Sequence, residues 1–153
     1  MMIEKESIKV VISDKAYPLP IEMRPLWRIC LIIISIAVVS GEKKYLDVKK
    51  VNILVWMIIR KLRWVEYENY LLGRASDIPL VSVDTATYKA VEFSMSKNFV
   101  ELKDGRLYLS SKGKDLYEVL VENGIMIDEI DFLKKFGKKL SNDKLKGLTG
   151  GFL

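Results

Sequence analysis

One apolar run, RPLWRICLIIISIAVVS, extends from Arg24 to Ser40, and between Ile29 and Val39 it carries one hydroxyl and no charge. A bilayer-spanning helix needs about 20 apolar residues. This run has 14 from Leu26 to Val39, counting Arg28, and charged residues flank it on both sides. Its β-branched residues leave a buried strand as an alternative, but its length and Pro25, which suits a first helical turn, favour a helix. We therefore expect a helix buried on nearly all sides and no membrane span.

The segments on either side predict further elements. Residues 8–12 are mostly β-branched and indicate a short strand, and the apolar helix should stop at Ser40-Gly41. Asp47 can cap a second helix, which continues or restarts before Gly73. Its apolar stripe comprises Val48, Val51, Val55, Ile58 and Leu62, with Lys49, Lys50 and Asn52 facing away. A third helix should begin after Asp84 and end near Asn98.

The clearest local pattern is VELKDGRLYL, from Val100 to Leu109. Asp-Gly favours a two-residue type I′ hairpin turn, and with that turn the apolar residues of both strands share one face. The expected pairs are Lys103 with Arg106, Leu102 with Leu107, and Val100 with Leu109. Ser110 or Ser111 can then cap a helix that ends at Asn123-Gly124.

This order of helices and hairpin is the layout of a winged helix-turn-helix domain. The stretch YLSSKGKDLYEVL resembles the end of many such wings, where a strand runs into a Ser-capped helix that begins with Lys-Gly. We predict a mainly α fold with a small β-hairpin (α+β), specifically a winged helix-turn-helix domain. The predicted organisation is an N-terminal extension with a short strand (1–23), the winged-helix domain (24–124) and a basic C-terminal helix and tail (125–153).

The composition limits the chemistry of the chain. Its 153 residues contain 25 Lys plus Arg against 20 acids, a net charge of +5, and no histidine. Histidine is the side chain best suited to proton transfer near neutral pH, and Cys30 is the one cysteine, so neither a disulfide within the chain nor a Cys–His zinc site can form. The N-terminus lacks the basic-then-apolar order of a secretory signal. We expect a cytoplasmic, non-catalytic protein without cofactor or metal.

The chain also contains an acidic cluster and a nuclease-like pattern, and both are too weak as enzyme motifs to change this expectation. The P-loop pattern is absent, and Asp128, Glu129 and Asp131 occupy helical positions that point different ways and would not converge on a metal. Asp84 followed by Glu101-Leu102-Lys103 loosely matches a nuclease pattern of carboxylates and lysine, but Leu102 pairs with Leu107 in the predicted hairpin and Lys103 lies at its turn. A small metal-dependent nuclease is therefore the weakest hypothesis.

Basic residues gather in two places. The predicted third helix has no net charge, because Lys89 and Lys97 balance Asp84 and Glu92. The candidate DNA contacts lie in the wing and in the tail: Lys103, Arg106, Lys112, Lys114, Lys134, Lys135, Lys138 and Lys139. The alternatives are an ordinary solvated hairpin and a frayed end, although Leu133, Phe136 and Leu140 have helical spacing.

Large aromatic side chains are dense in the first two helices. Trp27, Trp56 and Trp64 lie there, and the second helix is apolar on more than one face. Such an excess builds either a partner interface or a thick core, and the pattern alone leaves both open.

RPLWRICLIIISIAVVSGEKKYLDVKKVNILVWMIIR, followed by a wing and LSSKG, resembles the middle components of ABC three-component systems. These are small proteins encoded beside an SMC-like ABC ATPase, including in Lamassu-type anti-phage operons. The resemblance implies a winged-helix adaptor that docks on the ATPase and helps couple DNA sensing to an effector subunit, and it carries over no catalytic residue. The candidate partner-binding residues are Arg24, Leu26, Trp27, Arg28, Trp56 and Trp64. The alternative function is a winged-helix DNA-binding transcription regulator.

Overall fold

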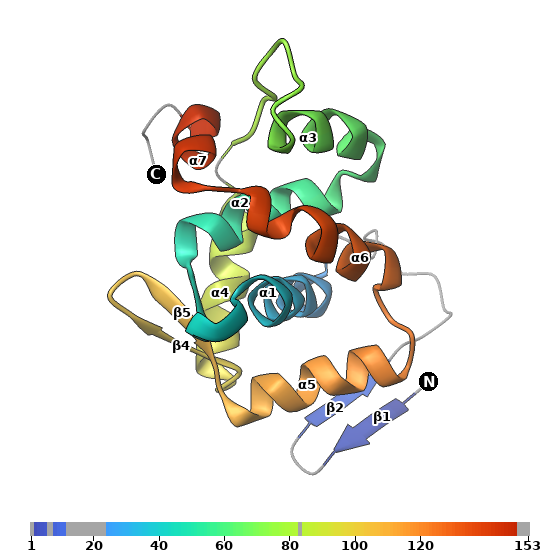
Figure 1. The fold of residues 1–153 in the computed structure, drawn as a ribbon. Coiled ribbons are helices and arrows are strands. Elements are labelled where there is room, and N and C mark those ends of the chain that lie inside the picture. The colour runs from blue at the N-terminus through green and yellow to red at the C-terminus, as the bar shows by residue number, and fades with distance from the viewer. Residues whose placement is uncertain (1, 6–7, 12–23, 83, 150–153) are drawn as a thin grey trace.

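Helix α1 (Pro25–Val39) runs through the middle of the molecule (Figure 1). It contacts α2, α4, α5, α6 and strand β5, so ten of its 15 residues are buried. The computed structural model describes residues 2–5, 8–11, 24–82 and 84–149. Pro25 occupies the first turn of α1, and the helix ends just before Ser40. The predicted buried helix is confirmed, and within the described residues no helix is long and apolar enough to cross a membrane.

The other helices surround α1, with α5 on one side and α2 and α6 on the other (Figure 1). Helix α2 is followed by a separate short helix, α3, so the second predicted helix restarts rather than continues. The helices are α2 (Val48–Ile59), α3 (Trp64–Leu71), α4 (Thr85–Ser96), α5 (Ser111–Glu122), α6 (Ile127–Phe136) and α7 (Asn142–Thr149). The described residues also form the 3-10 turns η2 (Gly41–Lys43), η3 (Lys61–Arg63) and η4 (Gly137–Lys139).

The predicted hairpin forms with the expected register. Strands β4 (Val100–Lys103) and β5 (Arg106–Leu109) pair antiparallel, with Leu102 opposite Leu107. Asp104 and Gly105 both have positive φ, 52° and 73°, as a type I′ turn requires. The fold is thus mainly helical with a small antiparallel sheet, which is the α+β class expected.

A third strand, β3 (Tyr45–Asp47), was not predicted. It pairs with β5 on the side away from β4, so the sheet order is β3-β5-β4. Three residues are too few to show an alternating pattern, and the preceding Glu42-Lys43-Lys44 looked like a charged linker. Near the N-terminus, β1 (Met2–Lys5) pairs with β2 (Ile8–Val11), the strand expected at residues 8–12, of which Ile12 lies outside the described residues.

Two of the three predicted helix caps form. The Asp84 carboxylate accepts a hydrogen bond from the backbone N–H of Ala86 at 3.0 Å, and Ser110, rather than Ser111, accepts from Gly113 at 3.1 Å. Asp47 stands at the N-cap position of α2, but its side chain makes no capping hydrogen bond.

The predicted stripe on α2 is wrong at two positions. The chain leaves the helix after Ile59, so Leu62 lies in η3 and is fully exposed. Asn52 was expected to face away but is buried, where its side-chain amide donates to the Val48 carbonyl at 2.9 Å. This bond satisfies the amide nitrogen, whereas the buried Oδ1 of Asn52 has no hydrogen-bond partner among the described residues.

The segment after Gly124 packs onto the core. Helix α6 contacts both α1 and α2, and Ile130, Phe132 and Leu133 belong to the same hydrophobic cluster as α1. Residues 127–136 and 142–149 are helical, so the frayed-end alternative is wrong for them.

Candidate functional site

Arg28 lies inside the fold. Its guanidinium donates to the Asp84 carboxylate at 2.7 Å and to the Thr87 hydroxyl at 3.1 Å, and the Arg28 and Asp84 side chains are only 10% and 16% exposed. This ion pair ties the start of α1 to the N-terminus of α4. The Arg28 side chain is therefore largely committed to contacts within the fold, and its partner-binding role stays a prediction.

Trp56 and Trp64 are both partly buried and packed against the core. The Trp64 indole donates to the Met57 carbonyl at 2.9 Å and stacks on Phe132 at 4.7 Å between ring centroids. The guanidinium of Arg60 covers the Trp56 ring at 3.3 Å. These two tryptophans join α2 and α3 to their neighbours, which favours the thick-core alternative for them.

The remaining apolar excess of α2 is also internal. Ile53, Leu54 and Met57, which lie outside the main stripe, are at most 1% exposed. One core therefore absorbs both apolar faces of this helix, and partner contact has to come from other residues.

Trp27 differs, because it lines an open hollow. The hollow has a volume of about 500 Å³ and an apolar floor with a mainly cationic rim. We call it the Trp27 cleft; it is lined by Trp27, Leu31, Ile58, Ile59, Arg60, Lys61, Leu62, Arg63 and Glu129. Leu62 is fully exposed at this cleft, and Lys61 lies 3.5 Å from Glu129, so the one acid is paired. Of the other expected partner residues, Leu26 is 40% exposed and Arg24 is partly buried, and neither lines the cleft.

The outward face of α4 is neutral and partly aromatic. Tyr88 and Phe93 are 38% and 50% exposed, and Lys89 and Glu92 between them balance in charge. A helix that enters a DNA groove normally presents cations to the phosphates. The outward face of α4 carries no excess of positive charge.

Most of the predicted DNA contacts are scattered. Lys103 pairs with Glu101 at 3.6 Å on the wing, while the Lys112 ammonium donates to the Lys97 carbonyl at 2.9 Å. The remaining exposed candidates lie on α5, α6 and η4: Lys114, Lys134, Lys135 and Lys139. None of these four lysines lines the hollow described next.

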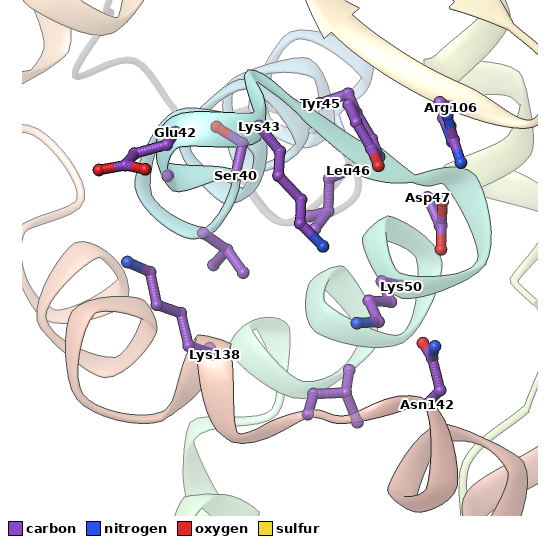
Figure 2. A pocket seen from close by; sticks show the side chains of 14 residues that line it. Ser40, Glu42, Lys43, Tyr45, Leu46, Asp47, Lys50, Arg106, Lys138 and Asn142 are labelled. Atoms are coloured by element: carbon purple, nitrogen blue, oxygen red, sulfur yellow. The ribbon is translucent and has the colours of Figure 1, made fainter.

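Arg106 and Lys138, in contrast, line the same hollow. It has a volume of about 600 Å³ and lies between η2, β3, the start of α2, β5 and η4 (Figure 2). We call it the basic hollow; its charged lining residues are Glu42, Lys43, Asp47, Lys50, Arg106 and Lys138, with Ser40, Tyr45 and Asn142 beside them. The Arg106 guanidinium lies 4.5 Å from the centre of the Tyr45 ring, a cation–π contact. Lys43 and Lys50 were not among the predicted cations, because only the unpredicted strand β3 brings them beside the β4–β5 hairpin.

No family model, curated protein or solved structure matches the chain.

Acidic side chains form no metal-binding group in the described part of the chain. No three Asp, Glu, Cys or His residues gather there, and Asp128 and Glu129 instead face Lys61 at 3.6 and 3.5 Å. Asp128 and Glu129 therefore act as partners of lysine rather than as metal ligands.

Cys30 is expected to be unreactive in the folded protein. It is buried in α1, and burial raises its pKa from 9.0 to about 12 because the thiolate loses its hydration. A thiol reagent at pH 8 should modify no cysteine in the native chain and one in urea. The unfolded chain ionises first, so the contribution of this thiol to stability is present below pH 9 and is lost as the pH rises towards 12. Rapid native labelling would contradict this expectation.

Proposed function

We propose that the chain is a non-catalytic winged-helix adaptor subunit of an SMC-like ABC ATPase complex. It docks on the ATPase and helps couple DNA sensing to an effector subunit, in anti-phage or anti-plasmid defence. The resemblance of the α1–α2 region and of the wing supplies the identity of the partner, and the Trp27 cleft is the observation that carries the docking function.

The order of the elements supports the winged-helix part of the proposal. Strand β3 comes between α1 and α2, and the hairpin β4–β5 follows α4, so one small sheet closes beside the three helices α1, α2 and α4. Helix α3 and its preceding turn are an addition between the second and third helices of that layout. They also contribute the exposed Leu62 to the cleft.

The Trp27 cleft has the makeup of a protein-docking site. Binding energy at protein interfaces concentrates in aromatic and arginine side chains placed around apolar pockets. Trp27 and Leu62 supply the apolar surface, and Arg60 and Arg63 line the same cleft, where Arg63 also pairs with Glu66 at 3.2 Å. This charge pattern suits an apolar segment of the partner that carries acidic residues.

The neutral face of α4 weighs against the regulator alternative. Tyr88 and Phe93 on that face suit contact with protein better than contact with phosphates. A chain that reads base sequence through α4 would need a different source of affinity.

Leu62→Asp is expected to abolish docking without harming the fold. Leu62 is fully exposed, so its replacement removes no core contact, but it places a carboxylate in the apolar part of the cleft. The tagged chain is produced with its neighbouring genes intact, and the SMC-like ATPase is identified among the bound proteins by mass spectrometry. We expect at least about tenfold less ATPase with the variant, a change of about 1.4 kcal/mol.

Leu80→Asp is the matched control, since Leu80 is 81% exposed and does not line the cleft. It should retain the ATPase. The adaptor proposal fails if no such ATPase co-purifies, or if both variants bind it as well as the unchanged chain. Sequence-specific duplex binding that persists at elevated salt would establish the regulator alternative instead.

A further inference from the structure

The basic hollow concentrates cations from four different elements. Lys43 belongs to η2, Lys50 to α2, Arg106 to β5 and Lys138 to η4, and they outnumber the two acids of the lining. Figure 2 shows the ammonium groups of Lys43 and Lys50 turned towards the same space, with Asn142 beside them.

The positive charge of these lysines is not neutralised within the described structure. No ion pair of the described residues includes Lys43, Lys50 or Lys138. Cations held around one hollow repel each other, and this repulsion is relieved when an anion enters. The lysines around the hollow therefore favour the binding of an anion.

The N-terminus of α2 also lies at the hollow, where the Asp47 carboxylate offsets part of its positive field and the Val48 N–H already donates to the Gly105 carbonyl. Asp47 occupies its N-cap position and lines the hollow, yet the Asp47 side chain makes no capping hydrogen bond. The positive end of the helix dipole favours bound anions, and phosphate oxygens accept from both ammonium groups and guanidinium groups. Arg106, fixed over Tyr45, offers such a planar donor.

We propose that the basic hollow binds phosphate groups, and that their source is the sugar–phosphate backbone of a nucleic acid duplex. The hollow adjoins the wing, because Arg106 directly follows the Asp104–Gly105 turn, so an extended ligand there also reaches Lys103 at the tip. This site goes beyond the proposed docking function. It shares no residue with the Trp27 cleft, and Lys50 and Ile59 lie at opposite ends of α2, about 14 Å apart along the axis.

The chain offers a closely matched pair of double variants. Lys50→Glu/Lys138→Glu reverses two charges in the hollow. Lys49→Glu/Lys139→Glu makes the same change at the neighbouring residue in each element, just before Lys50 and just after Lys138, where both side chains are exposed and outside the lining. A glutamate in the first turn of α2 favours the helix, so both variants should fold, which circular dichroism checks.

The experiment measures fluorescence anisotropy of the full-length chain with a labelled DNA duplex of about two turns, from about 50 to about 200 mM salt. The hollow variant should bind at least about 30-fold more weakly at the lowest salt, and the slope of log K against log salt should fall by about 2. The control variant should change affinity by less than about threefold, because its lysines lie outside the contact.

Inorganic pyrophosphate in a second arm separates the possible sources of phosphate. If pyrophosphate binds with the same dependence on Lys50 and Lys138 while the duplex does not bind, the phosphate site stands and the duplex as its source is overturned. Absence of both kinds of binding, or equal losses in the two variants, overturns the site itself. Co-purification of the ATPase, which Leu62→Asp tests, does not depend on any of these results.

Discussion

Replacing Asp84 by alanine is expected to lower the free energy of unfolding by about 4 kcal/mol. The substitution leaves the guanidinium of Arg28 in the interior without the carboxylate that lies 2.7 Å from it. Removing one partner of a buried ion pair costs about 3–5 kcal/mol, because the remaining charge stays desolvated. Helix α4 also loses its N-cap, since Asp84 accepts the hydrogen bond from Ala86.

Urea unfolding followed by circular dichroism measures the effect of Asp84→Ala. Asp84→Asn keeps a capping side chain and removes only the charge, so it should cost about half as much. Thr85→Ala, at the exposed next position, should change stability by less than about 0.5 kcal/mol.

Combining Arg28→Met with Asp84→Ala separates the two contributions. The double variant has no uncompensated buried charge, so it should be more stable than Asp84→Ala alone, although the helix cap is still missing. If Asp84→Ala lowers the free energy of unfolding by less than about 1 kcal/mol, the Arg28 guanidinium reaches water. That result would contradict the burial of this ion pair.

Features set by neighbouring residues could be predicted from the sequence. The register of the hairpin follows from the positive-φ turn at Asp104-Gly105 and from the alternation of the flanking strands, and the structure reproduces the three pairs that were expected. The caps at Asp84 and Ser110 are equally local, because each side chain bonds a backbone N–H two or three residues away.

Features set by distant residues could not be predicted. Strand β3 is defined only by its pairing with β5, about 60 residues later in the chain, and its three residues carry no pattern of their own. Arg28 looked like a surface residue beside Trp27, since its partners Asp84 and Thr87 lie 56 and 59 residues away. The early end of α2, which exposes Leu62, likewise has no glycine or proline to mark it.

The candidate site was predicted only in part, for the same reason. Arg106 and Lys138 were named as cations of two separate segments, and only the fold brings them to one hollow. Lys43 and Lys50 belong to segments that looked solvated. Lys43 and Lys50 come close to Arg106 only because β3 pairs with β5. The hydrogen bond from the Val48 N–H to the Gly105 carbonyl then holds the start of α2 against the hairpin turn.

Gly113→Ala is expected to destabilise the chain by about 3 kcal/mol. Gly113 lies in the first turn of α5, and a Cβ there would meet the carbonyl oxygen of Phe99 far inside van der Waals contact. That oxygen cannot turn aside easily, because the backbone N–H and the hydroxyl of Ser110 both donate to it at 3.0 Å. The helix-forming preference of alanine, worth about 1 kcal/mol over glycine, is too small to offset the clash.

The matched control for Gly113→Ala is Ser111→Ala in the same turn, an exposed position whose replacement should change stability by less than about 0.5 kcal/mol. Urea unfolding of both variants decides the matter, and equal or greater stability of Gly113→Ala would contradict the close approach of α5 to Phe99. If Gly113→Ala lowers the stability as expected, the close packing explains why glycine occupies this position of LSSKG. The end of the wing and the start of α5 pack so closely at Phe99 that only a residue without a side chain fits between them.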